Sequence, residues 1–324
     1  MHTLKELQQL VNTAIDALAT ERQPRGLYAP IDYVLSLGGK RIRPIMVLMA
    51  YNLYKDDVEK ALMPAIGLET YHNFTLLHDD LMDRADVRRG MPTVHKKWDD
   101  NTAILSGDNM LVLAMQRVAN CDALHIPAVV RLFTQTAIEI DEGQQYDMDF
   151  ETRNDVAEEE YIEMIRLKTS VLLACALKMG AILADSPEED MEALYRFGEK
   201  LGLAFQLQDD YLDVYGDFKT FGKSIGGDIM CNKKTYMLIN ALRLASSQQR
   251  QELQRWIDAE NPVPAEKIAA VTALYNEIGV PSMAQERIEK YFREALECLD
   301  HVKVAEERKA ALRELAERLM HRES

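Results

Sequence analysis

The chain has 324 residues, of which 47% are hydrophobic and 28% charged, and its 38 Lys and Arg against 53 Asp and Glu give a net charge of −15. This composition supplies enough apolar material for a sizeable core, and the acidic balance argues against broad binding to nucleic acids or anionic membranes. Only 15 glycines and 10 prolines occur, which argues against a turn-rich all-β protein.

Helical spacing then dominates the chain from its start. In residues 4–18, apolar side chains mostly recur three or four positions apart, which indicates one face of a helix. Breaks are expected where glycine and proline gather, at residues 38–39, 90–92, 185–187, 221–227, 261–264 and 279–281. We therefore predict an all-α fold of about ten helices or more, without a convincing strand, as a single domain over residues 1–324.

Neither a membrane-spanning segment nor a metal-binding group of cysteines is expected from the sequence. The most apolar segment, residues 171–184, is too short to cross a bilayer and contains Lys178. The four cysteines lie far apart and form no CxxC pair, which argues against a zinc site or a disulfide framework. We expect a cytoplasmic protein without stable membrane insertion.

Two aspartate-rich stretches stand out, HDDLMD at residues 78–83 and QDDYLD at residues 208–213. In each, the first and last aspartates are four apart, so both carboxylates leave the same helix face, and apolar residues precede them on that face. Inward carboxylates need a cation, and oxygen ligands of this kind suit Mg²⁺. The alternative is that these aspartates are exposed and unpaired near helix ends.

Basic residues cluster near these stretches. In GGKRIRP, at residues 38–44, Lys40 and Arg43 stand three apart at a predicted helix start, where backbone N–H groups also favour an anion. Arg88 and Arg89 follow the first aspartate stretch, and FGKSIGGDI and NKKT follow the second. Any one of these groups is commonly solvated surface, but together they suit a diphosphate-bearing substrate.

These motifs occur in the order seen in the trans-isoprenyl (polyprenyl) diphosphate synthases, and the sequence resembles that family over about residues 38–240. The resemblance implies a single large helical bundle with a central cavity, the isoprenoid synthase fold. It also implies a transferase that condenses isopentenyl diphosphate with an allylic diphosphate by Mg²⁺-assisted ionisation. Members of the family are commonly homodimers, and we expect the same here.

The resemblance also assigns roles to residues of this sequence. It implies metal ligation at four aspartates, Asp79, Asp83, Asp209 and Asp213. It implies contacts to the allylic diphosphate from four cations, Arg88, Lys168, Lys223 and Lys233. It implies an isopentenyl diphosphate pocket made by Lys40, Arg43, His72 and Arg89. Polar groups beside the allylic cation are implied at Lys168, Thr169 and Gln206.

Product length is expected to depend on residues before Asp79 on the same helix. In the family, bulk four, five and eight positions before that aspartate limits elongation, and these positions here are Thr75, Phe74 and Tyr71. Phe74 alone is typical of some geranylgeranyl diphosphate synthases. Adding Tyr71 is expected to shorten the cavity, so we predict farnesyl diphosphate (C15), with geranylgeranyl diphosphate (C20) as the alternative.

Three other functions are weighed against this one. A class I terpene cyclase shares an aspartate-rich motif but needs neither a GGKRxRP pocket nor a second complete DDxxD. A non-catalytic partner subunit of the same fold is expected to have lost one aspartate motif, and both are intact here. A di-iron carboxylate bundle needs two Glu-x-x-His motifs, and the sequence has one, at residues 69–72.

Overall fold

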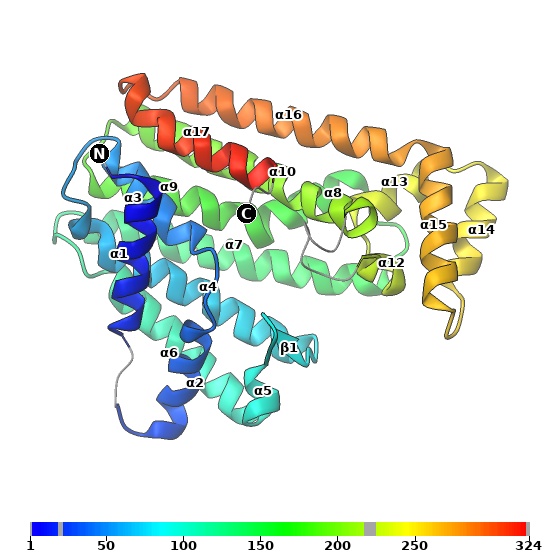
Figure 1. The fold of residues 1–324 in the computed structure, drawn as a ribbon, viewed down its shortest axis with the longest axis horizontal. Helices are drawn as coiled ribbons and strands as arrows, with labels where there is room; N and C mark the ends of the chain where they lie inside the picture. The colour runs from blue at the N-terminus through cyan, green and yellow to red at the C-terminus, as the bar shows by residue number, and fades with distance from the viewer. Residues whose placement is uncertain (1, 19–21, 217–224, 322–324) are drawn as a thin grey trace. The chain divides into compact units, whose positions relative to one another are not determined.

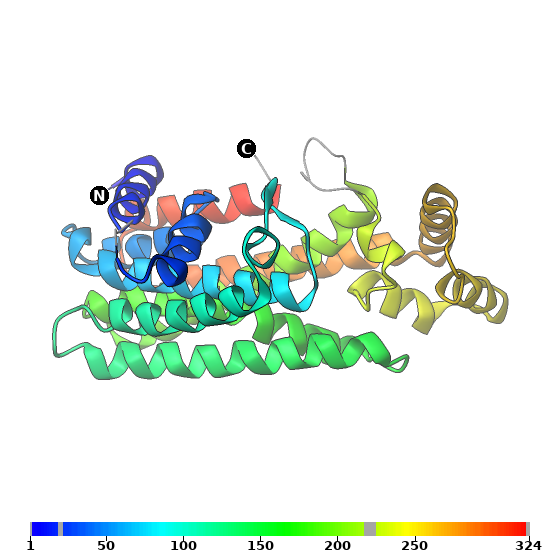
Figure 2. The same cartoon turned by 90° about the horizontal axis from the view of Figure 1, so that it is seen from below.

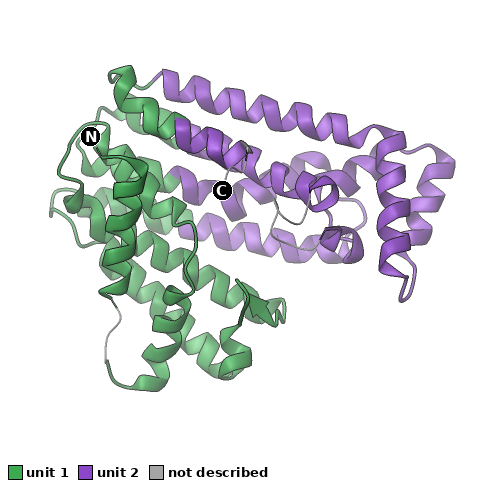
Figure 3. Ribbon diagram, in the orientation of Figure 1, with its two compact units in different colours: residues 1–136, 175–195, 302–313 green, residues 137–174, 196–301, 314–324 purple. Residues whose placement is uncertain are grey.

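The computed structural model describes residues 2–18, 22–216 and 225–321, which form helices and one short hairpin (Figure 1). The predicted all-α class is confirmed. Two compact units are distinguished (Figure 3): the first contains Met1–Thr136, Cys175–Tyr195 and Val302–Arg313, and the second Ala137–Ala174, Arg196–His301 and Glu314–Ser324. The single domain expected over residues 1–324 stays a prediction.

The first unit is built mainly from the N-terminal helices. These are α1 (Leu4–Asp16), α2 (Arg25–Ser36), α3 (Ile42–Asn52), the 3₁₀ turn η1 (Val58–Ala61), α4 (Leu62–Met82), α5 (Val94–Lys97) and α6 (Asp100–Val118). The boundary between the units falls inside four helices, α7 (Ile126–Thr152), α9 (Val171–Leu183), α10 (Glu188–Tyr215) and α17 (Glu306–His321).

The local sequence explains where α1 begins and which face it buries. Thr3 caps the helix, since its hydroxyl accepts from the Glu6 amide while the Glu6 carboxylate accepts from the Thr3 amide. Leu7, Val11 and Ile15 are at most 5% exposed, so the apolar stripe predicted for residues 4–18 faces the core of the unit.

The helix that ends in the first aspartate motif, α4, packs along α6. The two lie side by side in both views (Figures 1 and 2) and bury Leu68, Met110 and Ala114 completely. Pro64 falls in the first turn of α4, where the missing N–H costs no hydrogen bond. The helix that carries the first aspartate motif is therefore packed along α6 through buried side chains.

A hairpin follows α4 and differs from the expectation of no strand. β1 (Val87–Arg88) pairs antiparallel with β2 (Met91–Pro92). The turn residues Arg89 and Gly90 have φ values of 54° and 77°, and positive φ at both central positions is what a two-residue type I′ turn requires. Strands this short leave no alternating pattern in the sequence.

The second unit contains the shorter helices of the C-terminal half. These are α8 (Glu158–Ile165), the π-helical turn η2 (Arg166–Ser170), α12 (Gly227–Met230), α13 (Tyr236–Leu244), α14 (Ser247–Ile257), α15 (Pro264–Ile278) and α16 (Val280–Asp300). The breaks expected at residues 261–264 and 279–281 separate α14, α15 and α16, and α14 packs on α15 (Figures 1 and 2). Among the described helices, none combines the length and apolar character that crossing a membrane needs.

Candidate active site

In the first unit, the entry to α3 is fixed by a buried ion pair. Gly38, Gly39 and Arg41 all have positive φ. The Arg41 guanidinium donates to Glu69 Oε1 of α4 at 2.7 Å and to the Leu35 carbonyl at 2.5 Å. Both side chains of the pair are less than 5% exposed, so the loop that carries Lys40 is held firmly against α4.

Arg43, the second residue of α3, points at His72 of α4. Its Nη1 lies 3.1 Å from His72 Nε2, and burial lowers the pKa of Arg43 to about 10. Burial and the neighbouring arginines hold the pKa of His72 well below 6.5. His72 is therefore a neutral ring that accepts a hydrogen bond from Arg43 through Nε2.

The hairpin brings two more guanidinium groups to this region. Arg88 Nε and Nη2 donate to the Asp80 carboxylate at 2.7 to 2.8 Å. Arg89 donates to the Gly38 carbonyl, so the hairpin and the α3 entry loop are joined directly. Burial lowers the pKa of Arg89, with further contributions from Arg41 and Arg88.

This cluster of four arginines around His72 is suited to an anion. Arg41 and Arg88 are each paired with a carboxylate. Arg43 has none within ion-pair distance among the described residues, and its buried Nε has no hydrogen-bond partner there. A partly buried guanidinium with a buried Nε left in this way is costly unless a ligand completes its hydrogen bonds. Lys40 is exposed on the adjoining loop.

The first aspartate motif occupies the last turn of α4 and its C-cap. Asp79 is half-buried and Asp83 is exposed, and no basic residue lies in the last turn. Carboxylates at this end of a helix face the negative end of its dipole, which costs about 0.3–1 kcal/mol each unless a cation is bound. The inward placement expected for both carboxylates is therefore wrong for Asp83, which caps the helix at its exposed end. The oxygen donors of Asp79 and Asp83 still suit a hard divalent cation.

In the second unit, the second motif lies in the last two turns of α10, again without a basic residue in the last turn. Asp210 is 4% exposed and accepts hydrogen bonds from the Tyr161 hydroxyl and, at 3.2 Å, from the Tyr236 amide. Burial raises the pKa of Asp210 to about 7, opposed by the bond from Tyr161. Asp213 accepts from the Asp228 amide at 3.0 Å, while Asp209 is half-buried.

A π-helical turn, η2, presents Lys168 and Thr169. Lys168 Nζ lies 2.6 Å from Asp147 Oδ2 of α7, and Thr169 Oγ1 donates to Gln206 Oε1 of α10 at 3.4 Å. The turn approaches α7 at Gly143, where a Cβ would lie 2.3 Å from the Lys168 nitrogen. Only glycine permits that approach, and π-helical turns occur frequently at functional sites.

Lys233 is exposed on the turn between α12 and α13, and its charge helps to hold the pKa of Asp147 below its usual range. The second unit thus groups Lys168 and Lys233 around Asp147, and their contacts to a diphosphate stay a prediction. Lys223 lies outside the described residues.

The two residues of α4 that are expected to limit product length, Tyr71 and Phe74, differ in burial and in the rings that they contact. Tyr71 is 1% exposed. The centroid of its ring lies 5.1 Å from that of Phe133 of α7, in an edge-on contact, and 5.6 Å from that of Phe74. Phe74 is half-buried and packs on the His78 ring at 4.7 Å. The Tyr71 side chain is therefore part of the core and packs against the rings of both Phe133 and Phe74.

Three residues that complete these arrangements carried no role in the sequence analysis: Glu69, Asp147 and Tyr161. Glu69 fixes Arg41, Asp147 fixes Lys168, and Tyr161 donates to Asp210. The sequence singles out only the first two. Glu69 belongs to the one Glu-x-x-His motif, at residues 69–72, and Asp147 ends the segment GQQYD at residues 143–147, which loosely resembles a helix segment that lines the site in the family. Among the described residues, no group of three or more His, Cys, Asp or Glu side chains is gathered as a ready-made metal site.

Comparison with known proteins agrees with the motifs. Residues 24–278 match the family model described as "Polyprenyl synthetase". The chain is 41% identical over 240 residues to the geranylgeranyl diphosphate synthase of Methanosarcina mazei, covering 74% of each chain.

Solved structures extend the comparison to the whole chain. A crystal structure of a geranylgeranyl pyrophosphate synthase matches with a TM-score of 0.95 at 44% identity, covering 100% of both chains. The geranylgeranyl pyrophosphate synthase from Corynebacterium glutamicum, complexed with isoprenyl diphosphate and magnesium, matches with a TM-score of 0.85 at 27% identity over 99% of this chain and 98% of that one.

The all-α architecture and the solved structures that match the whole chain identify the isoprenoid synthase fold. Within that fold class, the chain belongs to the polyprenyl synthetase family. It is accordingly an enzyme, a transferase that forms isoprenyl diphosphates, as the resemblance implied.

Proposed function

We propose that the protein condenses isopentenyl diphosphate with an allylic diphosphate and that its main product is the C20 compound, geranylgeranyl diphosphate. The observation that carries the first part is Arg43, whose partly buried guanidinium hydrogen-bonds a neutral His72 and has no carboxylate within ion-pair distance among the described residues. A diphosphate supplies the negative oxygens that this group lacks.

The acceptor, isopentenyl diphosphate, is assigned to the first unit. Its diphosphate would accept from Arg43, Arg89 and Lys40, with His72 holding the Arg43 fork in place. Because this group does not leave during the reaction, these residues contribute to binding and orientation rather than to bond breaking.

The allylic diphosphate is assigned to the cations Arg88, Lys168, Lys233 and Lys223, of which the last lies outside the described residues. When its C–O bond breaks, the electron pair leaves with the pyrophosphate, and these cations stabilise the charge that develops. The polar groups of Thr169 and Gln206 face the allylic cation that remains. The isopentenyl double bond attacks that cation, a C–C bond forms, and a proton passes to the released pyrophosphate.

We propose Mg²⁺ as the metal, with Asp79, Asp83 and Asp209 as direct ligands. Bound Mg²⁺ would supply positive charge to the leaving pyrophosphate. The carboxylates at the negative ends of α4 and α10, without basic residues in the last turns, support this. Asp213 was expected as a further ligand, but its bond from the Asp228 amide favours a supporting role in which it fixes α12.

The C20 product replaces C15 as the favoured product. The relatives compared above are named for geranylgeranyl products, which supports the alternative over the C15 expectation. The bulky Phe74 next to the small Thr75 is the pattern that resembles some geranylgeranyl diphosphate synthases. A cytoplasmic location and a homodimer also stay proposals.

The test is product analysis of the purified protein with Mg²⁺, isopentenyl diphosphate and C5, C10 or C15 allylic diphosphates. We expect C20 from each allylic substrate, and longer products from the Phe74→Ala variant. Tyr71→Phe, which keeps the ring, serves as the matched control and should keep the C20 product. A product that stops at C15 would overturn the chain-length proposal, and no condensation with any allylic substrate would overturn the proposed reaction.

A further inference from the structure

A lysine of α15, Lys267, is almost completely buried in the second unit, with 2% of its surface exposed. Lysine is rarely buried to this extent without a charged partner. Among the described residues, the contacts of its ammonium group are to neutral acceptors and none is an ion pair, and burial lowers its pKa below 10.5. The position is thus energetically costly, and the hydrogen bonds of Lys267 show what it contributes.

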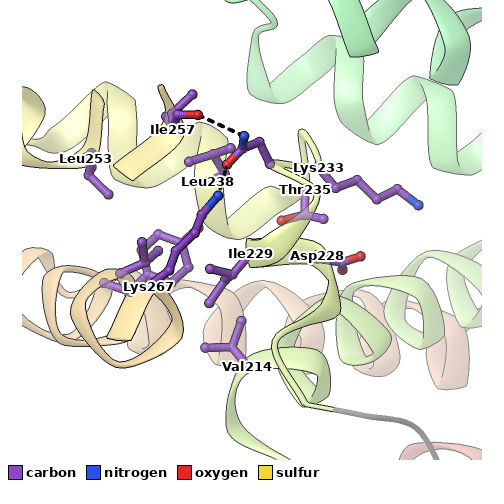
Figure 4. Close-up of a pocket in the computed structure, with 12 residues that line it drawn as sticks. Val214, Asp228, Ile229, Lys233, Thr235, Leu238, Leu253, Ile257 and Lys267 are labelled. Atoms are coloured by element: carbon purple, nitrogen blue, oxygen red, sulfur yellow. Dashed lines mark hydrogen bonds between the residues drawn. The ribbon is translucent and has the colours of Figure 1, made fainter. Parts of the chain in front are cut away.

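Lys267 donates to the turn that follows α12. Its Nζ lies 2.7 Å from Asn232 Oδ1 and 3.4 Å from the Met230 carbonyl, the last of that short helix. Figure 4 shows the lysine side chain extended from α15 up to this turn. Both acceptors are neutral, so the ammonium group forms directional hydrogen bonds and no ion pair.

Asn232 connects three helices through its side chain. Its amide nitrogen donates to the carbonyl of Ile257, the final residue of α14, at 3.0 Å, and the dashed line at Ile257 in Figure 4 marks this contact. Its own φ is 53°, a left-handed conformation that asparagine adopts more readily than most residues. Lys267 therefore holds the side-chain amide of Asn232, a residue whose backbone is in the left-handed conformation.

The next residue along is Lys233, whose backbone is fixed on both sides. Its amide donates to the Asp228 carbonyl at 2.9 Å, and its carbonyl accepts from the Thr235 amide at 2.8 Å. In Figure 4 its side chain extends away from Lys267. Its charge lowers the pKa of Asp147 and opposes the rise in that of Asp210, so this side chain is directed to the polar region of the second unit.

We propose that Lys267 is a positioning residue for Lys233. Through Asn232 it holds the left-handed turn that aims the Lys233 ammonium group at the diphosphate that leaves. This inference rests on the proposed function, in which Lys233 contacts the allylic diphosphate. Lys267 itself touches no substrate.

The first experiment compares Lys267→Met with Lys309→Met in the full-length enzyme. Methionine matches the length of lysine without its hydrogen bonds, and Lys309 is an equally buried lysine of the first unit. We expect Lys267→Met to raise KM for the allylic diphosphate and to weaken inorganic pyrophosphate binding by roughly ten-fold each, because a charge-assisted hydrogen bond is lost. KM for isopentenyl diphosphate should stay unchanged. Lys309→Met should alter neither KM.

A second pair of variants protects the test against misfolding. Asn232→Asp keeps an acceptor for Lys267 and should retain most of the pyrophosphate affinity. Asn232→Gly tolerates the left-handed turn but breaks the link, and it should reproduce the Lys267→Met phenotype.

A double-mutant cycle with Lys233→Ala separates this inference from the proposed function. If Lys267 acts through Lys233, adding Lys267→Met to Lys233→Ala should cause no further loss of pyrophosphate affinity. Additive losses, or wild-type affinity in Lys267→Met, would overturn the positioning role. Wild-type affinity and turnover in Lys233→Ala itself would instead overturn the role of Lys233 in the proposed function.

Discussion

The helices α4 and α10 end in aspartates of identical spacing, yet their carboxylates have different hydrogen-bond partners. In α4, Asp80 holds Arg88, a cation, while Asp83 is exposed at the helix end. In α10, Asp210 accepts from a tyrosine hydroxyl and a backbone amide, and Asp213 is buried against the start of α12. The two motifs are repeats in sequence but not in their surroundings.

This difference separates two tasks. The middle aspartate of α4 orients a side chain that we propose to contact substrate, so its effect is on binding. The middle and last aspartates of α10 join that helix to α8, α13 and α12, so their effect is on the structure of the second unit. The first aspartates, Asp79 and Asp209, are the pair in which we expect equal roles.

The largest predicted effect is on turnover, in the variants Asp79→Asn and Asp209→Asn, which test whether the first aspartates of the two motifs have equal roles. Each should lower turnover by roughly 10²–10³-fold, the order seen when a group that stabilises developing charge is removed. Without Mg²⁺, Asp79→Asn should also stabilise the protein by about 0.3–1 kcal/mol, since it removes a negative charge at a helix C-terminus. Steady-state kinetics and urea unfolding measure the two effects. Turnover at the wild-type rate in either variant would contradict the metal role.

A smaller effect should separate the middle aspartates. Asp210→Ala leaves two buried donors, the Tyr161 hydroxyl and the Tyr236 amide, without their acceptor, which should lower the free energy of unfolding by about 2 kcal/mol. Asp80→Ala should cost less than about 1 kcal/mol, because the Arg88 side chain is 34% exposed and water can solvate it. Urea unfolding of both variants checks the order.

Asp210→Asn is the matched control for that comparison. The amide oxygen can still accept from Tyr161, so this variant should recover most of the stability that Asp210→Ala loses. Equal losses in Asp80→Ala and Asp210→Ala would show that the two middle aspartates do the same work, against the difference described here.

Periodicity and punctuation in the sequence were enough to predict the all-α class and several helix boundaries. The break expected at residues 185–187 directly precedes α10, and Gly279 ends α15 with a φ of 88°. The carboxylate spacing on α4 and α10 was also predictable, because it depends only on helix geometry. Local signals suffice where the structure is set by residues a few positions apart.

The pairings that complete the site are long-range and left no such signal. Glu69 meets a residue 28 positions away, and Tyr161 meets one 49 positions away. A helical pattern indicates which face is buried but not which partner it meets. The π-helical turn at Lys168 was equally hidden, since it arises from the close approach to Gly143 in three dimensions. These are the features that distinguish two motifs of the same sequence pattern.

The smallest predicted effect concerns the cluster of four arginines around His72, beside the first motif. Because the folded-state pKa of His72 lies well below 6.5, the unfolded chain binds a proton there that the folded chain does not as the pH falls below about 6.5. This group should therefore lower the stability with falling pH by at most about 1.4 kcal/mol per pH unit. His72→Gln, which keeps an acceptor for Arg43, should flatten the dependence in thermal unfolding between pH 5 and 7. Saturating pyrophosphate should also flatten it in the wild type, because a bound anion favours the protonated ring. If the wild type and His72→Gln lose stability equally over this range, His72 is not a neutral acceptor within the arginine cluster.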